Sequence, residues 1–88
     1  MLPFNYAILR FVLRHGPSDA DAVMAGLADD YRRFRQFRKK AVVEALMTAR
    51  ANGLLEETHF DLDDAGDLRV FYQVTESGRR MITRYIGG

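Results

Sequence analysis

The second half of the sequence most restricts the fold, because a helical pattern is followed there by a hairpin pattern and then by another helix. The apolar helical segment ends at Asn52-Gly53, a pair that favours a left-handed helix stop. Residues 55–60 and 68–74 read as paired strands, joined by a hairpin loop at 61–67. Thr75 or Ser77 can then cap a last helix. This part of the chain is therefore predicted to fold as helix, hairpin, helix.

The first half predicts two helices and a start for the third. The first should run from about Pro3 to Arg14, because proline suits a first helical turn and apolar residues recur there at helical spacing. Ser18 begins a capping-box pattern, with Asp21 in place of the usual Glu, and so predicts the start of a second helix. Asp19 and Asp21 suit the positive end of that helix dipole.

The boundary between the second and third helices carries the weakest signal. Residues 29–37 contain neither Gly nor Pro, so one long helix remains possible. We place a break at 30–35, since a helix unbroken from 19 to 52 would be far longer than a small core needs. The third helix then covers about 36–51. Its inward face is predicted to be Val42, Ala45, Leu46 and Ala49.

On strand 68–74, one face at period two is predicted to carry Leu68, Val70, Tyr72 and Val74.

Length and composition limit the domain organisation. The 88 residues suit a single domain, 1–88, with enough apolar and aromatic side chains for one core. The absence of cysteine excludes disulfides, thiolate chemistry and Cys-based zinc sites, and favours a cytoplasmic location. The N-terminal apolar run is interrupted at Asn5 and Arg10, so we expect neither a membrane span nor a signal peptide.

Charges occur in blocks, although the formal net charge is only +1. Residues 18–31 and 56–67 contain acids but no Lys or Arg, whereas residues 32–40 contain bases but no acid. The cations of this basic cluster are Arg32, Arg33, Arg35, Arg38, Lys39 and Lys40. The folded domain should therefore have a basic pole and an acidic pole.

Two groups of residues carry a resemblance to a known family. The first is a periodic helix closing on a Gly-Leu pair, with Leu46, Ala49, Gly53, Leu54 and Leu55. The second is an aromatic strand and a Thr-x-x-Gly-Arg turn, with Arg69, Phe71, Tyr72, Val74, Thr75, Gly78 and Arg79. In this order the chain resembles winged-helix transcription regulators of the PadR type and, more loosely, the MarR type. The resemblance covers nearly the whole chain, and its motif-bearing part is 46–82.

The resemblance implies an α+β, mostly helical fold, a winged helix-turn-helix in the order helix, helix, helix, strand, strand, helix. The resemblance also implies that the two strands form an antiparallel wing and that the third helix enters the major groove of double-stranded DNA. On this reading the basic cluster contacts phosphates, while Gln36, Lys40 and Glu44 lie nearest the bases. The plainer interpretation of the cluster is a solvated charged face, and Glu44 could simply pair with Lys40. Phe34 and Phe37 are expected to anchor the turn in the core.

Two features depart from the family pattern. Family members normally add a long C-terminal helix for dimerisation, whereas this sequence stops at Gly88. A homodimer would then use the terminal helices, although the candidate contacts Phe4, Phe11, Tyr85 and Ile86 could equally be core. The acidic wing tip at 61–67 should be repelled by DNA. The alternative function is therefore a protein-interaction module that uses its acidic wing and basic cluster, and it even permits self-association between these two surfaces.

We expect no enzyme activity, cofactor or metal site. The wing loop resembles a calcium loop at Asp61, Asp63 and Gly66 but lacks the required acids at Ala65 and Tyr72. The two histidines have no second ligand in register, and no catalytic or phosphate-binding signature is present.

Overall fold

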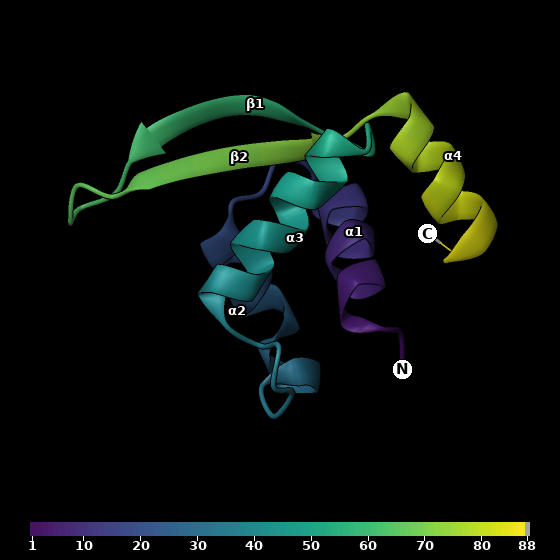
Figure 1. Ribbon diagram of the computed structural model, residues 1–88, viewed down its shortest axis with the longest axis horizontal. Coiled ribbons are helices and arrows are strands. Elements are labelled where there is room, and N and C mark those ends of the chain that lie inside the picture. Colours follow the sequence, from purple (N-terminus) through teal and green to yellow (C-terminus); the bar gives the residue numbers. More distant parts are fainter. Residues whose placement is uncertain (88) are drawn as a thin grey trace.

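The computed structural model describes residues 1–87 and has the predicted element order. Three helices are followed by a two-stranded antiparallel sheet and a fourth helix (Figure 1). The elements are α1 (Phe4–His15), α2 (Ala20–Tyr31), α3 (Lys39–Ala51), β1 (Leu55–Leu62), β2 (Leu68–Val74) and α4 (Glu76–Tyr85). The helices form one body, from which the hairpin projects to one side as a wing. The predicted winged-helix layout is therefore confirmed.

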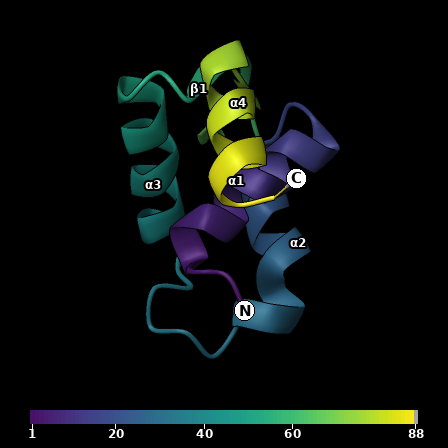
Figure 2. The same ribbon diagram turned by 90° about the vertical axis from the view of Figure 1, so that its right-hand side faces the viewer.

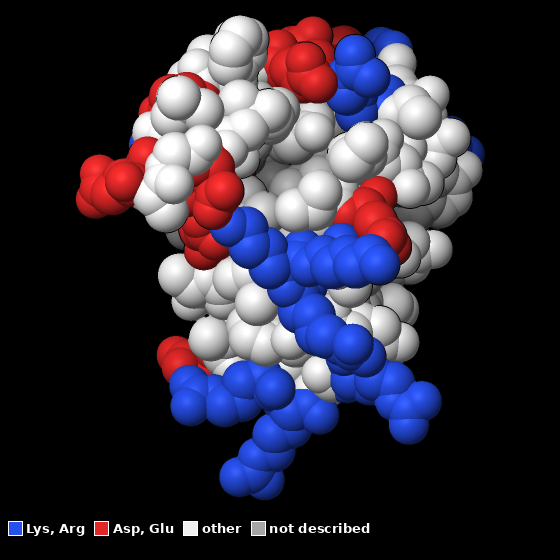
Figure 3. Space-filling view, turned by 60° about the vertical axis from the view of Figure 1, so that its left-hand side comes forward, with Lys and Arg blue, Asp and Glu red and all other residues white. Residues whose placement is uncertain are grey.

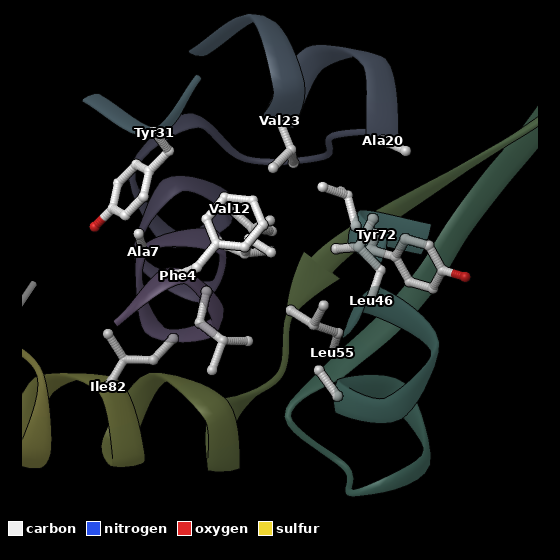
Figure 4. Packing of buried hydrophobic residues seen from close by; sticks show 14 residues of the cluster. Phe4, Ala7, Val12, Ala20, Val23, Tyr31, Leu46, Leu55, Tyr72 and Ile82 are labelled. Carbon is white, nitrogen blue, oxygen red and sulfur yellow. The ribbon is translucent and has the colours of Figure 1, made fainter. Parts of the chain in front are cut away.

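The core lies between α1, α2 and α3 and is closed by the base of the wing and by α4. Ile8, Val23 and Val42 are each 0–1% exposed, and they represent the three helices. Leu55 and Ile82 bring β1 and α4 into the same cluster (Figure 4). Each such side chain contributes about 1.5–3 kcal/mol when fully buried, so every element is held by the same core.

The start of α2 differs from the predicted capping box. The N-cap is Asp19, whose carboxylate accepts a hydrogen bond from the Ala22 amide at 2.9 Å, and the predicted cap Ser18 is wrong. Ser18 instead exchanges two backbone hydrogen bonds of 2.9 Å with Tyr72 of β2. The linker between α1 and α2 thus adds a short bridge to the sheet, which ties the helical body to the wing.

The predicted break between the second and third helices is confirmed, but the start of α3 was placed too early. Residues 32–38 form a turn held by backbone hydrogen bonds from Phe37 to Phe34 (3.0 Å) and from Arg38 to Gln36 (2.7 Å). Phe37 packs against Phe4 and the core, as expected, with ring centroids 6.1 Å apart. Phe34 remains 39% exposed, and its ring makes an edge-to-face contact with Tyr31 at the surface of the core. It is therefore not the core anchor that was predicted.

The wing is longer than predicted on its first strand and has the predicted apolar face. Register runs from Leu55 opposite Val74 to Leu62 opposite Leu68, with an irregularity between Glu57 and His59. The hairpin turn is 63–67, where the Asp63 carboxylate accepts hydrogen bonds from two backbone amides. Because the ribbon extends beyond the helices, the inner face is buried at its base and exposed toward its tip.

Helix α4 packs over α1, with α2 and α3 on either side (Figure 2). Of the two predicted caps, Thr75 is the one used. Among the predicted dimer contacts, Phe4 is buried in the core, and Phe11 and Ile86 pack against it. Tyr85 is 71% exposed. Three of the four predicted dimer contacts therefore pack within the fold itself.

Candidate nucleic-acid interface

The basic cluster lies at the junction of the turn and α3. Arg32, Arg33, Arg35 and Arg38 come from the turn, and Lys39 and Lys40 form the first residues of the helix. All six side chains belong to exposed residues. Figure 3 shows Lys and Arg gathered across the lower half of one face. The fold therefore brings the predicted phosphate-binding residues together on the surface.

Only part of this positive charge is neutralised by neighbouring acids. Arg32 pairs with Asp29 at 3.2 Å, and Lys39 pairs with Asp21 at 3.1 Å. The hydrogen bond and negative charge of Asp21 raise the pKa of Lys39 above its ordinary value. Within residues 1–87, no ion pair is formed by Arg33, Arg35, Arg38 or Lys40. These four cations can meet an external anion without breaking an internal pair.

The first turn of α3 adds to this positive field. Its N-cap, Arg38, makes no side-chain capping bond, and the turn contains no acid. The free amide groups of a helix start and the positive end of its dipole both attract anions. Lys39 and Lys40 oppose that dipole and cost helix stability. A phosphate at this position would relieve the unfavourable charge and bind the unpaired amides.

The structure separates the three predicted base-reading residues. Lys40 and Glu44 are exposed on α3, one helical turn apart. Gln36 was predicted to precede them on the same helix, but it lies in the turn before α3. The turn continues to Arg38, whose extended backbone, with φ −141° and ψ 146°, immediately precedes the first residue of α3.

Two polar residues of β2, Arg69 and Gln73, are engaged within the hairpin. Arg69 makes a two-pronged ion pair with Asp61, at 2.7 and 2.8 Å, and this hydrogen bonding lowers the pKa of Asp61. Gln73 donates to Glu56 at 2.6 Å. The hairpin turn between the strands presents Asp63, Asp64 and Asp67. The wing tip is therefore acidic, in contrast to the start of α3.

A groove between α3 and the inner face of the wing was not predicted from the sequence. It has a volume of about 530 Å³. Its apolar lining includes Val43, Leu46, Met47, Leu68, Val70 and Tyr72. Figure 3 shows this face hollowed above the basic band and bordered by acidic side chains. The sequence shows only that Met47 and Leu68 are apolar, and they line one groove because the wing folds back beside α3.

Residues 1–87 contain no group of three or more potential ligands that could hold a metal ion. In the same residues, no helix has both the length and the apolar character needed to cross a bilayer.

Comparison with solved structures identifies the architecture. PadR of Bacillus subtilis, solved in complex with operator DNA, superposes with a TM-score of 0.75 at 16% identity over 93% of this chain. A PadR-like transcriptional regulator of Bacillus cereus gives 0.68 at 16% identity, over 91% of this chain and 74% of its own. The PcaV transcriptional regulator of Streptomyces coelicolor, solved with its natural ligand, gives 0.63 at 19% identity, over 99% of this chain and 53% of its own.

This chain spans 46% of the Bacillus subtilis PadR chain. No protein-family model matches the sequence, and no curated protein matches it. At these identities the structural likeness establishes the fold. The chain therefore has the winged-helix fold found in PadR-like transcriptional regulators.

Proposed function

We propose that this chain binds double-stranded DNA as a transcriptional regulator. The observation that carries the proposal is the cluster of unpaired cations at the uncapped start of α3. In this proposal α3 enters the major groove, with Lys40 and Glu44 nearest the bases, while Arg33, Arg35 and Arg38 contact flanking phosphates. The DNA complex of the structurally similar Bacillus subtilis PadR supports the same role for this fold.

We expect Arg32 and Lys39 to contribute less to DNA binding, because each must break its ion pair with an acid of α2 before it can contact a phosphate. Gln36 remains a candidate DNA contact, but from the turn rather than from the helix. The acidic wing tip should be repelled by phosphates, so we expect the wing to contribute little affinity.

A regulator that reads a two-fold operator needs two copies. Pairing through the terminal helices stays a prediction, and it would rest on exposed residues such as Tyr85.

Fluorescence anisotropy with a random-sequence duplex tests phosphate binding without knowledge of an operator. We expect binding that weakens steeply between low and moderate salt, because each phosphate contact releases counterions. The triple variant Arg33→Ala, Arg35→Ala, Lys40→Ala should reduce the salt slope by about 1 for each removed contact. The matched control removes three exposed arginines of α4, as Arg79→Ala, Arg80→Ala, Arg84→Ala.

The two triple variants have the same net charge, so they separate a local interface from overall electrostatic attraction. Equal losses in both variants would contradict the assignment to α3. Absence of binding by the native chain at low salt would contradict DNA binding itself. Substitution of Glu44 by Ala should then alter the preference among duplex sequences while leaving the salt slope nearly unchanged.

A protein-interaction module is the second candidate, and it is favoured by the acidic wing tip beside an apolar groove. A DNA-binding wing would be expected to present cations to the backbone. Failure to bind the random duplex, together with an intact fold, would favour this candidate.

A further inference from the structure

The groove between α3 and the wing continues into an exposed apolar surface. Leu68 is 61% exposed, its cross-strand neighbour Leu62 is 65% exposed, and Met47 on α3 is 56% exposed. Phe60, opposite the groove residue Val70, is 71% exposed. Single exposed apolar residues are ordinary, but a continuous apolar patch in a small protein marks an interaction surface. We call the groove and these neighbouring residues the wing groove.

The charges around the wing groove define what it can accept. Three ion pairs on its margin are internally neutral, and they join Asp21 to Lys39, Glu57 to Arg50, and Asp61 to Arg69. The carboxylates of Asp64 and Asp67 at the wing tip form no ion pair with a residue in 1–87. The surplus charge is therefore negative. A complementary partner should present an apolar group beside unpaired cations.

The turn before α3 has this chemistry. Of the two phenylalanines in the turn, Phe34 is the exposed one, at 39%. It stands between Arg33 and Arg35, neither of which forms an ion pair with the described chain. The basic band and the hollowed, acid-bordered surface are visible together on one face of the molecule (Figure 3). One face of the molecule thus carries both the wing groove and a turn whose apolar and basic side chains complement it.

We propose that a second copy of this chain occupies the wing groove, in a two-fold dimer in which the turn of each copy docks into the wing groove of the other. A two-fold axis makes both contacts at once, since residue i meets j and j meets i. Arg33 and Arg35 face Asp64 and Asp67 across each contact, and Phe34 covers the apolar patch. A dimer that paired two wings directly would bring the tip carboxylates of both copies together, and is opposed by their repulsion.

This dimer covers the cations that are assigned to phosphates in the proposed function. The protein would then exchange between a self-paired form and a DNA-bound form, and DNA would dissociate the dimer. The exchange rests on the proposed function, but the dimer does not. Sedimentation velocity without DNA therefore tests the dimer by itself. Binding of the random duplex by Leu68→Ser, which leaves the basic cluster and the net charge unchanged, tests phosphate binding by itself.

The experiment uses complementary charge reversals on the full chain. The wing variant is Asp64→Arg with Asp67→Arg, and the turn variant is Arg33→Glu with Arg35→Glu. Each variant alone places like charges across both contacts, so we expect its dimerisation constant to weaken at least about tenfold. An equimolar mixture of the two variants restores opposite charges at both contacts and should return the dimer. Added salt should weaken the native and mixed dimers alike.

Arg79→Glu with Arg80→Glu on α4 is the matched control for the turn variant, because it makes the same change in net charge away from the proposed contact. This control should dimerise like the native chain. Leu68→Ser removes an exposed apolar contact with little effect on the core, and it should weaken the dimer as well. Circular dichroism should show the native helix content in every variant.

The proposal would be overturned by a native chain that stays monomeric up to the millimolar range at low salt, by a mixture that remains monomeric, or by a dimer that neither charge reversal weakens. The last result would place the interface elsewhere, for example on the terminal helices. Assemblies that grow beyond two copies would also contradict it, because two-fold closure leaves no free contact.

Discussion

The starts of α3 and α4 differ in whether the chain itself satisfies the free amides and the positive dipole end of the helix. Helix α4 begins at Thr75, whose hydroxyl oxygen accepts a hydrogen bond from the Gly78 amide at 3.0 Å, and Glu76 lies in its first turn. Helix α3 begins at Arg38 without a side-chain cap, and its first turn contains two lysines and no acid. The first arrangement satisfies free amides and the helix dipole, whereas the second leaves both unsatisfied.

The difference indicates which helix start is reserved for the fold and which is available for a ligand. The α4 start is also bound to the rest of the molecule, because Thr75 donates to the Gly53 carbonyl and its amide donates to Leu54. The α3 start is exposed and gains stability only if an anion supplies the missing negative charge. The comparison therefore predicts opposite responses to substitution at the two positions.

The largest effect is expected from Gly78→Ala at the start of α4. A methyl group there would collide with the Leu54 carbonyl oxygen, which is held in place by its hydrogen bond from Thr75. We expect a loss of about 3 kcal/mol in the free energy of unfolding, measured by urea denaturation. In the control, Gly26→Ala, the methyl group would meet the movable side chain of Phe11, so the loss should be clearly smaller. Equal losses would contradict this account.

An intermediate effect is expected when the α4 cap is removed. Thr75→Ala deletes the acceptor for Gly78 and the donor to Gly53 together, and should lower the free energy of unfolding by about 1–2 kcal/mol. Thr75→Ser keeps the hydroxyl group and should preserve most of the stability. If the alanine and serine variants denature at the same urea concentration, the cap does not hold α4.

The smallest effect is expected at the start of α3, where a substitution should raise the stability instead of lowering it. Arg38→Asp supplies the missing cap at a position whose backbone is already extended, and should stabilise the protein by about 0.5–1 kcal/mol. The same change should weaken binding to the random duplex, because it places a carboxylate where a phosphate is proposed. Arg38→Ala removes the cation without adding a cap and should weaken binding without stabilising. Undiminished binding by the aspartate variant would show that the α3 start does not receive phosphate.

The element order was predictable because each element carries its own local signal. Asn52-Gly53 marks the end of α3, and Gly53 has the left-handed φ of 77° that such a stop requires. Thr75 was named as a possible cap and serves as one. The alternation in strand 68–74 correctly identified its inner face, and the position of the basic cluster beside the third helix followed from sequence order alone.

The errors arose where a distant part of the chain competes for a local group. Ser18 has the chemistry of a cap, but its backbone is bound by Tyr72, which lies 54 positions away, and Asp19 takes over the cap. Gln36 has no local signal that separates a turn from a first helical turn, and the packing of Phe37 on Phe4 decides in favour of the turn. Phe34 and Phe37 look alike in sequence, yet the core accepts only the second.

The sequence by itself determined the helices, the hairpin, the capped start of α4 and the separation of charge into blocks, because these depend on neighbouring residues and on periodicity. Tertiary structure alone decided that Lys39 of the basic cluster is neutralised, since Asp21 and Lys39 meet only when α2 packs beside α3. It also formed the wing groove, because Met47 and Leu68 line one surface only after the hairpin lies against the helical body. The Asp21–Lys39 ion pair and the groove both depend on contacts between elements, and no local pattern records them.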